Sequence, residues 1–181
     1  MPNPPTRRLR AAVTLLGVIA VAAPPATPAQ GVHIKLAAWP QAVLMDTLRQ
    51  DHELSAAPDS VYQAVLRAFA DVGIPTGRTD GRAGIIGSER FERQRALGNV
   101  LLSKLFDCGE GPAGPNADLF RLEIAVVAWV APAGNGTKLG MAAVASGRDV
   151  SGVFRNPKEC ASTGALELKV LDRVSKLVGG S

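Results

Sequence analysis

The stretch from Asp118 to Arg148, DLFRLEIAVVAWVAPAGNGTKLGMAAVASGR, decides the fold of this chain. In its first part, from Asp118 to Ala131, apolar residues recur at every second position, which predicts a long strand with one face in the core. The residues expected on that core face are Phe120, Leu122, Ile124, Val126 and Val130. Arg121 and Glu123 are expected on the opposite face.

A second strand is predicted to return antiparallel to the first, from Thr137 to Arg148. The connection between them, Pro132 to Gly136, contains Asn135 and two glycines, which supply the positive φ angles that a tight hairpin needs. Further strands are predicted for Val43 to Leu54, Ile85 to Phe91 and Val100 to Phe106, because their apolar runs have the lengths of strands.

Two helices are predicted, one between the strands at Val43 to Leu54 and Ile85 to Phe91, and one after the strand that ends at Arg148. The first opens at Pro58, with a capping box formed by Ser60 and Gln63, and stops at Gly73. Its apolar stripe contains Val61, Val65, Ala68, Phe69 and Val72. The second begins near Ser162 or Thr163 and runs to about Val178. Its stripe contains Leu166, Val170, Val174 and Leu177.

The order of these elements indicates an α+β fold, a curved antiparallel sheet with two main helices packed on one face. Strands and helices do not alternate as a parallel sheet would require. The chain of 181 residues has room for one domain, assigned to residues 43–181. Residues 30–42 form an arm whose order the sequence leaves open.

The first 29 residues have the pattern of a signal peptide. Three arginines (Arg7, Arg8 and Arg10) precede an uncharged, mostly apolar run from Ala11 to Ala23, too short to span a bilayer. Cleavage is expected after Ala29, with Ala22 and Ala26 as alternatives. Because no cysteine follows the leader directly, the mature protein is expected to be periplasmic or secreted, without a lipid or transmembrane anchor.

Removal of the leader changes the charge balance. The whole chain has a net charge of +4, and loss of the three arginines leaves 17 basic against 16 acidic residues, a net charge of +1. The densest basic stretch, Arg78 to Arg95, is interrupted by acidic residues and is interpreted as a solvated face. A nucleic-acid partner is therefore not expected.

Cys108 and Cys160 are the two cysteines of the chain. An even pair in an exported protein predicts a disulfide. The alternative is a metal or redox site. The chain has no C-x-x-C motif, and its two histidines, His33 and His52, do not form a zinc motif with the two distant cysteines. No metal or cofactor is expected.

Catalytic motifs find little support. Gly109 to Gly114 matches G-x-G-x-x-G, but Pro112 and Pro115 remove amide donors and oppose the helix that a dinucleotide site needs. His52 lies between Asp51 and Glu53, yet in a strand both acids point away from the imidazole. Without a nucleophile, a base and its orienting partner, the chain is predicted not to be an enzyme.

A stretch from Ala57 to Ile86 contains a helix that ends in Gly73-Ile74, then Asp80, Gly81 and a strand. This pattern resembles the helix-grip domains of BamC-type lipoproteins of the outer-membrane barrel-assembly machinery. The resemblance covers about thirty residues of low-specificity pattern and implies the fold and an envelope setting, with no catalytic residue to transfer. The chain departs from that family by lacking a lipidated cysteine and by carrying its own cysteine pair, as other small exported bacterial proteins do.

Two functions follow as hypotheses. The first is a non-enzymatic interaction module of the bacterial cell envelope, which binds another envelope protein through a free sheet face or strand edge. The second is a carrier for a small apolar ligand, with a cavity between the last helix and the sheet. Tyr62, Phe120 and Trp129 are the candidate ligand or partner surface, because aromatic residues line such sites.

Overall fold

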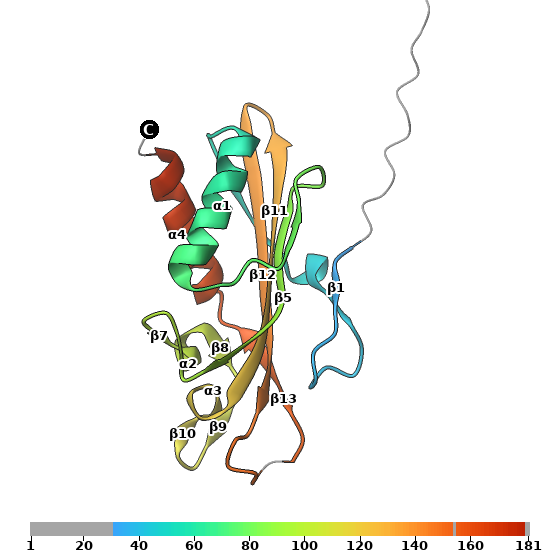
Figure 1. Cartoon of the computed structure of the whole chain (residues 1–181), viewed down its shortest axis with the longest axis vertical. Coiled ribbons are helices and arrows are strands. Elements are labelled where there is room, and N and C mark those ends of the chain that lie inside the picture. Colours follow the sequence, from blue (N-terminus) through green and yellow to red (C-terminus); the bar gives the residue numbers. More distant parts are fainter. Residues whose placement is uncertain (1–30, 154, 180–181) are drawn as a thin grey trace, which may run out of the picture.

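The computed structural model describes residues 31–153 and 155–179, so the predicted signal peptide lies outside the described part of the chain. Figure 1 shows three layers, with two helices on one side of an antiparallel sheet and an N-terminal arm on the other. The expected α+β class, with two main helices on one sheet face and one disulfide, is confirmed. Among the described residues, no helix has the length and apolar character needed to cross a membrane.

The centre of the sheet is the predicted hairpin. Strand β11 (Arg121–Ala133) pairs with β12 (Gly136–Arg148) along its whole length, from Arg121 opposite Arg148 to Ala133 opposite Gly136. Gly134 provides the positive φ of the turn, at 54°, whereas Asn135 does not adopt one. The first strand begins later than predicted, because Asn116–Leu119 forms the short helix α3.

Five shorter strands complete the seven-stranded sheet. Beyond β11 lie β5 (Ile85–Gln94) and then β4 (Arg78–Asp80). The other edge of β12 is shared by β3 (Gln50–Leu54) and β13 (Lys158–Ser162), and β13 in turn pairs with β8 (Phe106–Asp107). All these pairings are antiparallel, as predicted.

Helices α1 (Pro58–Val72) and α4 (Ala165–Gly179) pack against each other and against the sheet. The α1 stripe is buried as predicted, and Leu166, Val170 and Val174 of α4 are fully buried. Gly73 ends α1 with φ at 89°, also as predicted. The predicted capping box is wrong: Pro58 occupies the first turn, and Ala57 stands at the cap without a side-chain hydrogen bond, so Ser60 lies inside the helix.

The arm, residues 31–48, covers the opposite face of the sheet. It contains the paired strands β1 (His33–Ile34) and β2 (Val43–Leu44) and the single-turn helix η1 (Met45–Leu48). A second hydrophobic core joins this arm to the sheet: Val32, Ile34, Leu36, Met45, Ile85, Ala125, Val127, Trp129, Ala142 and Val144. The prediction of one strand over Val43 to Leu54 is therefore wrong, since the chain turns at η1 to cover apolar residues of the sheet.

Residues 96–119 form a small lobe at one end of the sheet. It consists of β6 (Ala96–Leu97), β7 (Val100–Leu101), α2 (Leu102–Leu105), β8, β9 (Glu110–Gly111), β10 (Gly114–Pro115) and α3. The single strand predicted for Val100 to Phe106 is wrong, because α2 interrupts it and buries Leu102 and Leu105. The Cys108–Cys160 disulfide ties this lobe to β13.

Candidate functional site

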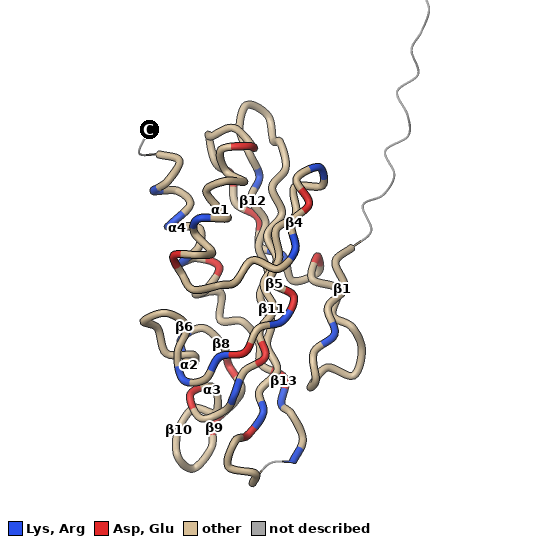
Figure 2. The backbone as a smooth tube through the Cα atoms, in the orientation of Figure 1, with Lys and Arg blue, Asp and Glu red and all other residues tan. Residues whose placement is uncertain are grey.

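At one end of its side of the sheet, the arm covers Ser146, which is 3% exposed, but leaves Arg121 and Arg148 exposed. Along β11, the residues on this side change from Trp129, Val127 and Ala125 under the arm to Glu123 and Arg121 beyond it. The register places Ser146 opposite Glu123 and Arg148 opposite Arg121 on β12. Because residues paired across strands share a face, these side chains form one polar surface. Figure 2 shows charged residues gathered at this end of the sheet.

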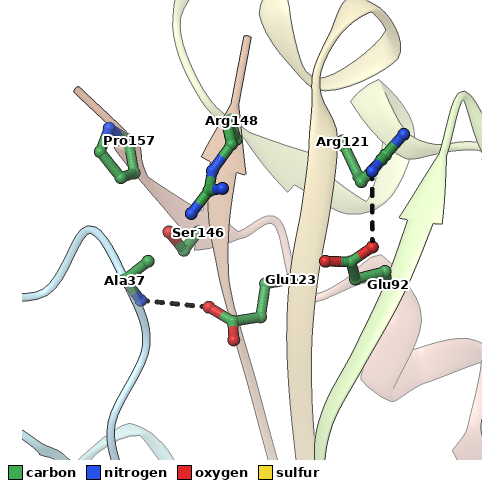
Figure 3. A pocket seen from close by; sticks show the side chains of 7 residues that line it. All are labelled: Ala37, Glu92, Arg121, Glu123, Ser146, Arg148 and Pro157. Atoms are coloured by element: carbon green, nitrogen blue, oxygen red, sulfur yellow. Dashed lines mark hydrogen bonds and ion pairs between the residues drawn. The ribbon is translucent and has the colours of Figure 1, made fainter. Parts of the chain in front are cut away.

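We call this surface the open face and define it by Glu92, Arg121, Glu123, Ser146 and Arg148. Together with Ala37 of the arm and Pro157, its residues line a cleft of about 100 Å³. Figure 3 shows the Arg148 side chain extending over Ser146 toward Ala37, while Arg121 turns toward Glu92.

The arm fixes one wall of this cleft through hydrogen bonds. The amide of Ala37 donates to Glu123 Oε2 at 3.1 Å, and the amide of Ala38 donates to Ser146 Oγ at 2.9 Å. The indole Nε1 of Trp39 donates to the carbonyl of Ala145 at 3.1 Å. Glu123 and Ser146 are therefore held in place by backbone groups of the arm, and their first role is to anchor it.

The charges of the open face are loosely paired, and Glu92, Arg121 and Arg148 are exposed, whereas Glu123 is half-buried. Arg121 Nη1 lies 3.9 Å from Glu92 Oε2, and Arg90 Nη1 lies 4.0 Å from Glu123 Oε1. Arg148 is exposed and makes no ion pair within the described residues. Exposed pairs at such distances contribute little to stability. The surface therefore offers guanidinium donors and carboxylate acceptors to a partner at little cost to the fold.

The three predicted aromatic residues do not come together. Phe120 is buried in the core beneath the helices, where it packs beside Gly147, whose added Cβ would lie 2.9 Å from the ring. Tyr62 lies on α1 and borders an open hollow near Gly84. Trp129 lies on the other side of the sheet, under the arm, with the guanidinium of Arg49 5.7 Å from its ring centre.

His52 lies on the helix side of the sheet, because it pairs with the buried Leu139. Its Nε2 is buried without a hydrogen-bond partner in the described part of the molecule. Asp51 points to the arm side, where it pairs with Arg49 at 2.8 Å and lies 3.9 Å from Lys138. The neighbouring acids thus point away from the imidazole, as the strand prediction requires, and no carboxylate of residues 31–153 or 155–179 orients it.

The remaining motif residues have structural positions. Gly109 to Gly114 includes the short β9–β10 hairpin, and the helix that follows, α3, has four residues. This is not the strand–turn–helix of a dinucleotide site. In the described ranges, no group of three or more His, Cys, Asp or Glu side chains is arranged to hold a metal ion.

Sequence reasoning did not select the residues of the open face. The signal available was the change along alternate positions of β11, from charged Arg121 and Glu123 to apolar Ala125, Val127 and Trp129. Ser146, Arg148 and Glu92 join the surface only through strand register, which the sequence alone does not give.

A scan against models of known protein families finds no match for this chain. A search of curated proteins finds no matching relative either.

Proposed function

We propose that this chain is a non-enzymatic interaction module of the bacterial cell envelope, exported to the periplasm or secreted, and that the open face binds another envelope protein. The observation that carries this proposal is that both apolar faces of the sheet are already covered, one by α1 and α4 and the other by the arm. The uncovered part of the sheet is polar, which suits a protein surface better than an apolar ligand.

The chemistry of the open face supports a partner with mixed charge. Arg121 and Arg148 lie opposite each other, and Glu92 and Glu123 lie opposite each other on the adjacent pair of strands. Guanidinium groups bind carboxylates through paired hydrogen bonds and are enriched at protein interfaces. A partner that presents acidic side chains to Arg148 and basic ones to Glu92 would complement this surface.

The compartment is part of the proposal. The leader pattern and the resemblance to BamC-type helix-grip domains support an envelope setting, and a buried disulfide is compatible with an oxidising compartment. The lack of a lipidated cysteine after the leader supports a protein released from the membrane.

The carrier hypothesis receives less support from the packing. Leu166, Val170 and Val174, the residues of α4 that would roof a cavity, have no exposed surface and belong to the core that joins the helix to the sheet. A ligand beneath α4 would have to displace these side chains, and protein interiors are close-packed with few voids.

Site-specific photo-cross-linking in the native host tests the proposal. A cross-linker at Glu159, which is exposed and pairs with Ser146 on the open face, is expected to capture one discrete protein. A cross-linker at the exposed Ser175 on the distant face of α4 is the matched control and is expected to capture none.

Charge reversal identifies the surface responsible. Arg148→Glu, combined with the cross-linker at Glu159, is expected to abolish capture, because the new carboxylate repels the acidic side chains of the partner. Arg148 is exposed, so its replacement leaves the core intact. Equal capture from both cross-linker positions, or capture that survives Arg148→Glu, would contradict the assignment of the open face.

A further inference from the structure

The outer edge of β5 has no described strand paired with it beyond Gly87, although Gly77 lies beside Glu89 and Arg78 Nη1 lies 3.8 Å from Glu89 Oε1. Strand β4 pairs with β5 only at Ile85, Ile86 and Gly87. On its inner side β5 pairs with β11 at Ser88 and again from Phe91 to Gln94, and no described strand pairs with its outer side over this stretch. Such an edge presents backbone N–H and C=O groups that can pair with a further strand.

Three charged side chains of this edge are exposed, while Phe91 is buried and Arg93 is half-buried. The sequence is Glu89-Arg90-Phe91-Glu92-Arg93, and the side chains of Glu89, Arg90 and Glu92 are 59%, 63% and 67% exposed. Figure 2 shows red and blue segments alternating along this part of β5. Charged residues on an edge strand usually prevent association of strands, because like charges meet.

We infer that this edge pairs with the same edge of a second copy of the chain, antiparallel and centred on Phe91. In that register Arg90 faces Glu92 of the second copy, and Glu89 faces Arg93 of the second copy. The two-fold symmetry repeats each pair, so every acidic side chain of the segment faces a basic one. Opposite charges across paired strands stabilise the pairing.

Neighbouring registers bring like charges together. Moving the centre by half a residue toward Glu92 places Arg90 opposite Arg93, and moving it the other way places Glu89 opposite Glu92. Centring the pairing on Arg90 or on Glu92 places that residue opposite itself. Because like charges directly opposite are destabilising, the sequence selects the register centred on Phe91.

The fold places the decisive pair on one side of the sheet. Glu92 pairs with Glu123 across the strands, and the Arg90 guanidinium approaches the same Glu123 carboxylate at 4.0 Å, so both lie on the arm side. Arg93 points to the helix side, where it donates to the carbonyl of Gly73 at 2.8 Å. A bulge in the pairing of β5 with β11 falls at Glu89 and Arg90. The Arg90–Glu92 contact therefore dominates the interface.

The interface is small, so the dimer is weak and depends on concentration. It consists of one strand edge and lies below the area of stable protein interfaces. Its charge pairs are exposed and therefore screened by salt, with a Debye length of about 10 Å at 0.1 M. The association should weaken as the salt concentration rises.

Sedimentation equilibrium of the exported, disulfide-bonded chain over a range of concentrations at low salt tests the inference. The wild type is expected to form dimers. Arg90→Glu and Glu92→Arg each replace two attractive pairs with two repulsive ones and are expected to weaken dimerisation about tenfold or more. The double variant, Arg90→Glu with Glu92→Arg, restores opposite charges and is expected to dimerise like the wild type.

Arg67→Glu is the matched control, because it changes the net charge as Arg90→Glu does at an exposed position of α1. It should leave the dimer unchanged, as should Arg148→Glu, which lies on the open face and away from the β5 edge. Because Glu92 belongs to both surfaces, the comparison of Arg90→Glu with Arg148→Glu separates the dimer from partner binding. A wild-type monomer at every concentration would overturn the inference. So would single variants that dimerise like the wild type, or a double variant that does not.

Discussion

Glu167 of α4 accepts a hydrogen bond from the backbone amide of Ala143 in β12, with 3.1 Å between the nitrogen and Oε1. Strand β3 pairs with β12 as far as Met141, and β13 begins to pair with it at Val144. The carboxylate thus binds an amide in the gap between the two strands that share this edge. Its other oxygen accepts from Ser162 Oγ at 2.8 Å.

Replacing Glu167 with alanine is expected to lower the free energy of unfolding by about 2–4 kcal/mol, because a buried amide loses its acceptor and charge-assisted hydrogen bonds are lost. Glu167→Gln keeps an acceptor for the Ala143 amide and should cost less. Urea denaturation measures both effects. Leu168→Ala, at the neighbouring exposed position, is the control. Equal stability of Glu167→Ala and Leu168→Ala would contradict the role of the carboxylate.

Removal of the disulfide is expected to lower the melting temperature strongly. Cys108 and Cys160 are 52 residues apart in sequence, and releasing a loop of that size costs about 4 kcal/mol in the chain-entropy account. Calorimetry of the Cys108→Ala, Cys160→Ala double variant measures the loss. Mass analysis of the unreduced exported protein should find no free thiols, and two free thiols would contradict the bond.

The arm should detach when a charge is placed beneath it. Leu36→Asp puts an unpaired carboxylate at a position that is 1% exposed, which is expected to cost about 2–4 kcal/mol. Trp39 and Trp129, the two tryptophans of the chain, both contact the arm-side core, so their fluorescence should shift to the red. His33→Asp, at an exposed position of β1, should leave the emission unchanged. An unshifted spectrum for Leu36→Asp would show that the arm is held in another way.

A small apolar probe should not bind the native chain with saturation at one site. Trp129 is 8% exposed beneath the arm and the Arg49 side chain, so a fatty acid has no path to its ring without detaching the arm. Titration with a fatty acid, followed by tryptophan fluorescence, is expected to give no saturable quenching. Saturable quenching that is lost on replacing Trp129 with a charged residue, in a variant that stays folded, would favour the carrier hypothesis.

Local patterns were enough to predict the framework of the fold. The period-two alternation around Leu122 and Ile124 predicted the central hairpin, and the stripes containing Val65 and Val170 predicted which helix faces are buried. The disulfide was predictable because the chain contains two cysteines. The hairpin and the helix faces follow from neighbours in sequence, and the disulfide follows because the two cysteines have no other cysteine to pair with. None of the three requires knowledge of which distant segments pack together.

The arm shows where this reasoning fell short. Val32, Ile34 and Leu36 alternate with exposed His33 and Lys35, which is the pattern of a half-buried strand, but the run is short. The sequence also contains the segment that the arm covers. Ala125 to Trp129 is apolar at every position, as expected of a strand whose two faces are both covered. The sequence does not state that these two segments, some ninety residues apart, contact each other.

The sequence by itself determined the strands of the hairpin, the two main helices and the cysteine pair, because hydrophobic periodicity and chain chemistry act locally. Only the tertiary structure decided that the arm covers the second face, that Arg148 lies opposite Arg121, and that Glu167 reaches the gap in β12. Those relationships depend on strand register and on how the helix α4 and the arm pack against the sheet. Both are set by the simultaneous burial of many apolar side chains, which no single segment specifies.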